Sequence, residues 1–115
     1  FFSGAPPEFM KIDTEGAELG VLRGARALIE KGKPILHLEI GEPSCEAFGY
    51  RPDAIYSLVR DAGYEMFDIL GLPIETIERF NESSSAPGIY DYIAIADGDP
   101  RKAIALEACH QMWRL

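Results

Sequence analysis

The sequence has few of the features that mark membrane, disulfide-rich or nucleic-acid-binding proteins. No apolar run approaches the length needed to span a bilayer. The 11 lysines and arginines are outnumbered by 19 acidic residues, so a net charge of −8 would repel nucleic acid. Its two cysteines, Cys45 and Cys109, lie in unlike contexts and favour free thiols over a disulfide. These absences favour a soluble, cytoplasmic protein without a nucleic-acid or membrane partner, whose ligands are neutral or cationic small molecules.

Length and composition predict one small α/β domain. The 115 residues are 47% hydrophobic, which allows a single core of modest size over residues 1–115. Residues 1–7 contain two prolines and a glycine, so we expect an extended lead-in to the first strand. Because the chain begins at Phe1 with no element before Phe9, the sequence favours a processed product or an excised piece.

The rest of the chain is organised around residues 9–18. Residues 9–12 are mostly apolar and suit a strand covered on both faces, and a helical pattern begins after Gly16. Ligands gather beyond the carboxyl ends of parallel strands in open α/β sheets, so Asp13 and Glu15 are candidate functional residues. A second interpretation stays open, because acidic residues at a helix start also satisfy free backbone N–H groups and the helix dipole.

Four segments, taken in order, resemble the later half of the catalytic domain of one enzyme family. Lys11-Ile12-Asp13-Thr14-Glu15-Gly16-Ala17-Glu18, followed by Val21-Leu22-Arg23-Gly24-Ala25, closely resembles the fourth strand and following helix of the FkbM-type methyltransferases, which use S-adenosylmethionine. Residues 34–40 resemble the family's fifth strand, residues 63–69 its sixth and residues 90–95 its seventh. The resemblance covers roughly residues 7–96.

The resemblance implies a fold and an activity. The fold would be a three-layer, Rossmann-like methyltransferase sheet, present as its C-terminal half only, with strand order 4-5-7-6 and the last strand antiparallel. The activity would be methyl transfer from S-adenosylmethionine to the hydroxyl of a small molecule or sugar. The sequence has no glycine-rich loop after a first strand, nor an acidic residue to hold the ribose, so by resemblance the main cofactor-binding half is missing.

Four carboxylates are the candidate site residues. We assign Asp13 and Glu15 as catalytic, Asp13 also as cofactor-binding, and Glu39 and Glu42 as substrate-binding. Asp13 would face the amino-acid end of the cofactor or the substrate, and Glu15 would orient the turn. Glu42 belongs to residues 41–50, a predicted substrate loop that follows the carboxyl end of a strand.

Residues 35–40 alternate, which places Ile35, His37 and Glu39 on one face of a strand. If this strand lies parallel beside residues 9–13, Lys11 approaches Glu39 or His37, because a buried charge needs a partner. Lys11 and Glu39 are therefore predicted to share an ion pair or a polar cluster. A purely structural ion pair remains the alternative to a functional one.

A first helix is predicted from Ala17 to Lys31, ended by a left-handed cap at Gly32. Gly16, Gly20 and Gly24 recur at every fourth position, which indicates close packing of this helix on the sheet.

Three further segments complete the pattern. A packing helix is predicted over residues 52–62, and a flexible connection over residues 74–88. Asp99 is expected to cap a final helix. One stripe of that helix suits core packing and contains Leu106, Cys109, His110 and Trp113.

Two rival functions remain open. The chain would be a non-catalytic α/β interaction or oligomerisation module if it did not bind the cofactor, or a metal-assisted methyltransferase if Asp13 and Glu39 supplied oxygen ligands. A missing neighbour would also leave the strand at residues 9–13 as an open edge. We expect that edge to associate with a second copy or the missing N-terminal half, or to be covered by residues 1–7 or by the final helix with Trp113.

Overall fold

The computed structural model describes residues 8–86 and 88–112. The strands are β1 (Phe9–Ile12), β2 (Ile35–Glu39), β3 (Tyr64–Asp68), β4 (Pro73–Ile74) and β5 (Asp91–Ala96). The helices are α1 (Glu18–Gly24), α2 (Arg26–Gly32), α3 (Glu42–Ala47), α4 (Pro52–Asp61), α5 (Ile77–Ser85) and α6 (Lys102–Met112).

The strands form one five-stranded mixed sheet in the order β1-β2-β5-β3-β4. β1 is parallel to β2, whereas β5 is antiparallel to both β2 and β3. β1, β2 and β3 therefore run in the same direction, and their carboxyl ends lie at one edge of the sheet. The order of the first four strands and the reversed last strand agree with the order that the resemblance implied, while β4 adds a short strand beyond it.

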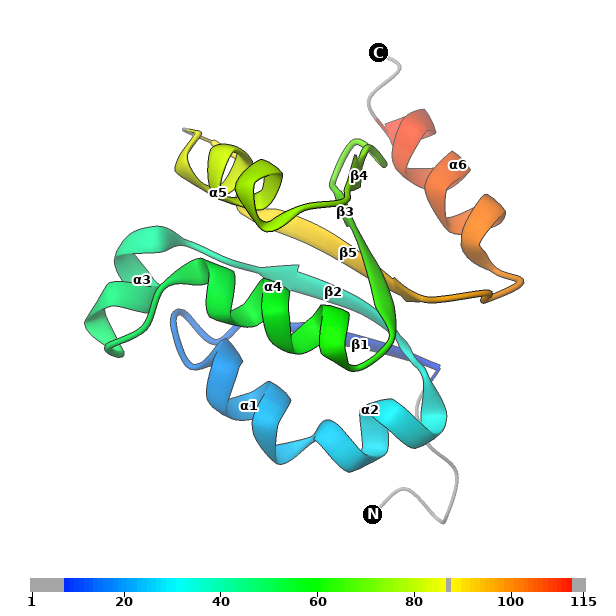
Figure 1. Cartoon of the computed structure of the whole chain (residues 1–115). Coiled ribbons are helices and arrows are strands. Elements are labelled where there is room, and N and C mark those ends of the chain that lie inside the picture. The colour runs from blue at the N-terminus through cyan, green and yellow to red at the C-terminus, as the bar shows by residue number, and fades with distance from the viewer. Residues whose placement is uncertain (1–7, 87, 113–115) are drawn as a thin grey trace.

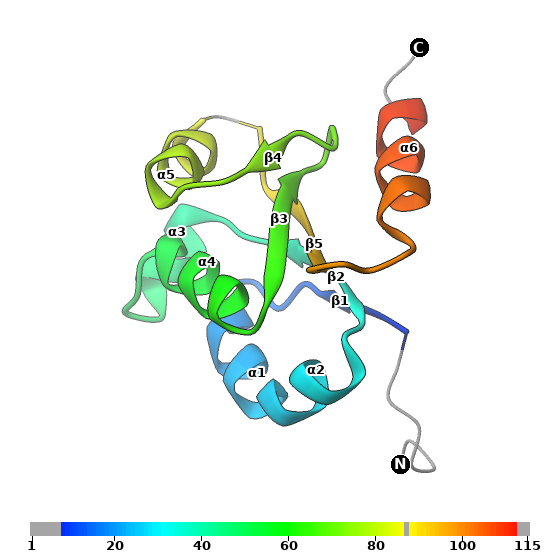
Figure 2. The same ribbon diagram turned by 45° about the vertical axis from the view of Figure 1, so that its right-hand side comes forward.

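Helices lie on both faces of the sheet (Figure 1), and α6 stands apart from the others (Figure 2). The larger core joins the sheet to α1, α2, α4 and α5, and its fully buried members include Leu22, Ile29, Leu36, Leu38, Ile55, Met66 and Phe80. The smaller core lies beneath α6 and contains Phe67, Ile93, Ile95 and Cys109. The apolar alternation along the strands thus separates two cores of unequal size.

The helix predicted over residues 17–31 is divided in two. α1 ends and α2 begins around Ala25, whose backbone is not helical at φ −97° and ψ 6°. Gly24 precedes it, and glycine is a weak helix former. The left-handed cap also lies at Lys33 (φ 48°) rather than Gly32, and the Lys33 side chain donates a 2.6 Å hydrogen bond to the Ala62 carbonyl.

Gly20 and Gly24 do not pack the helix closely on the sheet, so the prediction of close packing was wrong for these two glycines. A Cβ added at Gly20 or Gly24 would meet nothing within 4 Å. At Gly16, in contrast, it would lie 2.5 Å from the Ser44 carbonyl oxygen. The close approach at Gly16 joins the turn after β1 to α3 rather than a helix to the sheet.

Two segments predicted as loops contain helices. The predicted substrate loop over residues 41–50 holds α3, with Pro43 in its first turn. The predicted flexible connection over residues 74–88 holds α5, which Thr76 caps by accepting a 3.1 Å hydrogen bond from the Arg79 N–H. Phe80 of α5 is fully buried against Tyr56 and Tyr92, so tertiary packing stabilises this polar helix.

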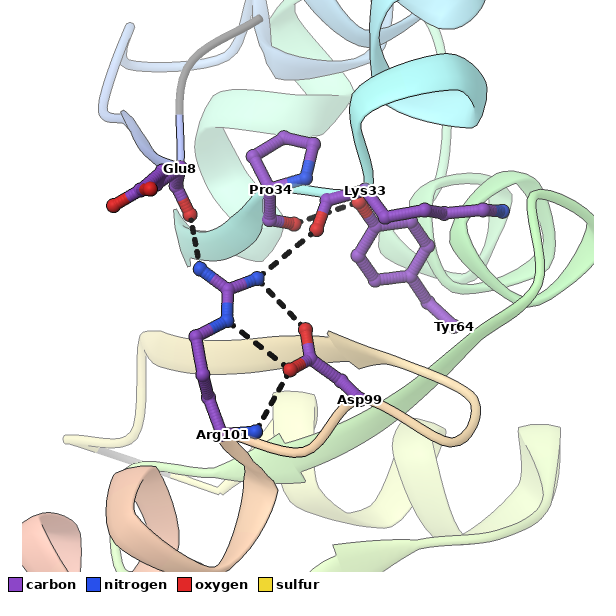
Figure 3. A network of polar contacts seen from close by, with 6 residues as sticks. All are labelled: Glu8, Lys33, Pro34, Tyr64, Asp99 and Arg101. Atoms are coloured by element: carbon purple, nitrogen blue, oxygen red, sulfur yellow. Dashed lines mark hydrogen bonds and ion pairs between the residues drawn. The ribbon is translucent and has the colours of Figure 1, made fainter.

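An arginine fastens α6 to the start of the sheet (Figure 3). The Arg101 guanidinium donates to both Asp99 carboxylate oxygens, to the Glu8 carbonyl (3.0 Å) and to the Lys33 carbonyl (3.2 Å). The hydrogen bonds from the Arg101 side chain and backbone N–H lower the pKa of the Asp99 carboxyl. This network lies at the amino-terminal ends of β1 and β2, opposite their carboxyl ends.

The predicted stripe of α6 is partly confirmed. Cys109 is buried and Leu106 packs against the smaller core, but His110 is exposed beside Gly71. Trp113 and residues 1–7 lie outside the described residues. The cover that they were expected to give to β1 therefore remains a prediction.

Candidate active site

Carboxylates gather at the carboxyl ends of β1 and β2. Glu39 lies opposite Asp91 across the pairing of β2 with β5, and Asp13 follows β1 on the other side of Glu39. The carboxyl group of Asp13 lies close enough to raise the pKa of Glu39, so the two side chains are neighbours. We call Asp13, Glu39 and Asp91 the carboxylate row.

The row changes the acidity of its central member. Desolvation raises the pKa of Glu39 above its usual value of 4.5, and the negative charges of Asp13 and Asp91 raise it further. The positive charge of Lys11 lowers the pKa of Glu39, because it attracts the ionised carboxylate. A carboxyl group with a raised pKa holds a proton more firmly and is a stronger base once ionised.

A histidine and a lysine complete the cluster. His37 Nε2 donates a 2.9 Å hydrogen bond to Asp91 Oδ1, since an ionised carboxylate can only accept. Lys11 lies beside His37 in the register of β1 with β2 and is exposed. The prediction that Lys11 and Glu39 share a polar cluster on adjacent strands is confirmed, but no Lys11–Glu39 ion pair forms among the described residues and Lys11 is not buried.

The turn after β1 is organised by Glu18 rather than Glu15. Glu18 is 1% exposed, and its carboxylate accepts hydrogen bonds from the Thr14 N–H (2.8 Å), the Thr14 hydroxyl and the Gly16 N–H (3.0 Å). Glu15 is exposed and has a left-handed backbone with φ 52°. The expected orienting role of Glu15 therefore belongs to Glu18, which uses both carboxylate oxygens to fix the backbone that follows Asp13.

The turn is also attached to α3. Tyr50, just past α3, donates a 2.6 Å hydrogen bond to the Gly16 carbonyl. Gly16 takes φ 116°, and its missing Cβ leaves room for the Ser44 carbonyl and the Phe48 ring. The turn after β1 and the helix after β2 consequently share one edge of the sheet, as the sequence predicted for Asp13 and Gly41.

Glu42, the second predicted substrate-binding residue, is half-buried in the first turn of α3. There a carboxylate suits the positive end of the helix dipole. The structure thus brings Asp13 and Glu39 together but places Glu15 and Glu42 on separate parts of the turn and helix. His37 and Asp91 are the cluster members that the assignment omitted, although the alternation of residues 35–40 had placed His37 on the correct face.

The described residues contain no group of three or more His, Cys, Asp or Glu side chains arranged to hold a metal ion. Within the same ranges, no helix is both long and apolar enough to cross a membrane.

Cys45 and Cys109 are free and buried, as predicted for free thiols, and burial raises the pKa of both. Cys45 lies in α3 rather than in a loop.

Comparison with known proteins supports the interpretation of these motifs. The Methyltransferase FkbM domain model matches residues 2–66, more than half of the chain, from before β1 into β3. Neither curated proteins nor solved structures gave a match. The matched residues include Asp13, Glu18 and Glu39, and therefore the turn and two strands that build the candidate site. The chain belongs to the FkbM methyltransferase family.

Proposed function

We propose that the chain forms part of an S-adenosylmethionine-dependent methyltransferase with a three-layer, Rossmann-like sheet, acting on a hydroxyl of a small molecule or sugar. Family membership supports the activity. The carboxylate row supports the location of the active site, because it lies at the carboxyl ends of parallel strands. Free, buried thiols suit a reducing compartment such as the cytoplasm.

The carboxylate row fits the cationic parts of the cofactor. S-adenosylmethionine supplies a methyl group activated on a positively charged sulfonium, and it also carries an ammonium group. Asp13 and Glu39 attract such charges, whereas they would repel the carboxylate of the same molecule. Asp13 would accordingly face the ammonium or the substrate, and the basic group needed for the carboxylate would come from outside this row.

The same carboxylates can prepare a hydroxyl acceptor. As the acceptor oxygen forms its bond to the methyl carbon and the carbon–sulfur bond breaks, the hydroxyl proton must leave. Ionised Glu39 is the candidate base, because desolvation and the neighbouring negative charges raise the pKa of its carboxyl group. Glu18 holds the turn that positions Asp13, so its contribution is alignment rather than proton transfer.

We expect the isolated chain to show little or no methyl transfer, since no glycine-rich cofactor loop occurs in its sequence. An assay with labelled cofactor and a panel of hydroxyl acceptors tests this, and turnover by the purified chain would overturn it. Calorimetry with S-adenosylmethionine tests binding. The variants Asp13→Asn and Glu39→Gln should weaken any binding, while Glu78→Gln, an exposed change on α5, serves as the matched control.

The rival proposal is a non-catalytic interaction module. Within the described residues β1 pairs with β2 alone, and Phe9 is 55% exposed beside its open side. An unpaired strand edge recruits another strand. A well-folded chain that binds no cofactor but associates through β1 would favour the module, whereas stoichiometric cofactor binding would favour the enzyme.

A further inference from the structure

We propose that a cavity between β3, β4 and α5 binds one hydroxyl-rich ring, such as a sugar or cyclitol unit of the methyl acceptor. The cavity measures about 190 Å³ and lies beyond the carboxyl end of β3. None of its lining residues belongs to the carboxylate row. This assignment rests on the proposed function only in identifying the bound ring as part of the acceptor.

The size and walls of the cavity limit what it can hold. Drug-sized ligands and cofactors occupy pockets of roughly 300–1,000 Å³, so about 190 Å³ suits a single ring. Pro73, Ile74 and Ile89 form an apolar side against which the C–H face of a saturated ring can pack. A whole nucleoside would not fit.

Asp68 supplies a fixed acceptor. Its residue is 9% exposed, and Oδ1 accepts the N–H groups of Leu70 (2.9 Å) and Leu72 (3.0 Å). No residue in the described part of the chain forms a hydrogen bond with Asp68 Oδ2. In the same part of the chain, every fully buried side-chain oxygen or nitrogen has a hydrogen-bond partner. Asp68 lines the cavity, where Oδ2 is available to a ligand hydroxyl.

Donors and further acceptors come from α5. Arg79 and Glu82 line the cavity, and both side chains are more than half exposed. Arg79 Nη1 lies 3.4 Å from Glu82 Oε2. Ser83 adds a hydroxyl that already shares a 3.0 Å hydrogen bond with Tyr92. Arg79 and Glu82 can therefore turn toward a ligand without breaking a buried pair.

The mixture of charges selects the class of ligand. The two carboxylates, Asp68 and Glu82, would repel an anion and attract a cation, and Arg79 would do the reverse, so no charged ligand meets favourable charges throughout the cavity. A neutral polyol suits both signs, because each hydroxyl can donate to a carboxylate and accept from a guanidinium. Hydrogen bonds to charged groups are also the stronger ones.

The cavity is too distant to hold the reacting hydroxyl itself. β3 lies two strand positions from β2, which carries Glu39, and this corresponds to roughly 10 Å at the usual strand spacing. β1, β2 and β3 end on the same edge, so an extended acceptor can reach both places. The ring in this cavity would then be a remote unit whose binding energy helps to align the reacting end.

The test is an NMR titration of the full, isotopically labelled chain with methyl α-D-glucopyranoside, without cofactor. We expect millimolar binding, with amide shifts concentrated at Asp68, Ile74 and Ser83. The double variant Arg79→Gln/Glu82→Gln should weaken binding by about tenfold. Its exposed positions should leave the fold intact, which the remaining spectrum checks, and Arg23→Gln on α1 is the matched control.

Three results would overturn the inference: no localised shifts with the glucoside or with myo-inositol at tens of millimolar, equal affinity in the double variant, or stronger binding of inorganic phosphate or ethylammonium. Because no cofactor is present, the outcome is independent of methyl transfer. Glucoside binding by a chain that never binds S-adenosylmethionine would support the sugar site and count against the proposed enzyme activity alone.

Discussion

Tyr50 donates a 2.6 Å hydrogen bond to the carbonyl oxygen of Gly16, a residue 34 positions earlier in the chain. The Tyr50 side chain thereby couples the turn after β1 to the end of α3. Burial raises the pKa of the Tyr50 hydroxyl, so it remains a neutral donor across the physiological range. The position of Asp13 consequently depends on packing at α3 as well as on its own strand.

The same substitution should have opposite effects at two glycines. Gly16→Ala should destabilise the chain by about 2–4 kcal/mol, because the new Cβ would overlap the Ser44 carbonyl and the backbone has φ 116°. Gly20→Ala should stabilise it by about 0.5–1 kcal/mol, because Gly20 lies inside α1 with open space around it. Urea denaturation measures both, and a stable Gly16→Ala variant would show that the turn and α3 are not in contact.

Glu18→Gln should destabilise the chain by about 1–3 kcal/mol. The replacement amide turns one acceptor into a donor facing N–H groups that the Glu18 carboxylate now satisfies. Glu15→Gln is the matched control and should have little effect, since Glu15 is exposed. Equal stability of the two variants would contradict the role assigned to Glu18.

Glu39→Gln should stabilise the fold at neutral pH by up to about 1 kcal/mol, since it removes one of three clustered carboxylates. The folded-state pKa of Glu39 is raised, so the wild-type protein regains this stability as protonation relieves the repulsion at lower pH. The advantage of the variant should therefore shrink as the pH falls through the folded pKa toward 4.5. Thermal denaturation across that range measures it, and a constant difference would refute the shared-charge account.

Arg101→Met should cost roughly 1–2 kcal/mol at neutral pH, allowing for partial exposure of the arginine, because it removes the guanidinium hydrogen bonds to Asp99 and to the Glu8 and Lys33 carbonyls. The lowered pKa of Asp99 means that the Arg101–Asp99 contribution is present above 3.8 and is lost as the pH falls through the lower, folded value. Arg26→Met, which removes an exposed pair with Glu30, is the control and should change stability little. A loss as small as in that control would show that Arg101 does not fasten α6.

Self-association through β1 is the last prediction. Sedimentation should show concentration-dependent association that Met10→Lys reduces, because a charge at this edge opposes pairing with a second strand. The exposed Phe9 side chain beside the edge would add apolar contact area. A monomer at every concentration would refute self-association through β1. The remaining expectation would then be that another part of the chain covers this edge.

Local periodicity determined much of the fold. The change of period after Asp13 predicted β1 and a following helix, the alternation of residues 35–40 placed His37 and Glu39 on one face, and the spacing over residues 52–62 predicted α4. These signals arise from contacts between residues a few positions apart. If the two strands pair in parallel, the same signals place Asp13 and the end of the strand that carries Glu39 at one edge of the sheet.

Only the tertiary structure decided which carboxylates act together. Asp91 joins the carboxylate row because β5 inserts antiparallel beside β2, a pairing of residues 52 positions apart. Glu18 replaces Glu15 at the turn because a left-handed backbone exposes one side chain, while the first turn of α1 buries the other. α5 forms in a polar segment because Phe80 packs into the core. Strand register and burial depend on distant partners, which no local spacing specifies.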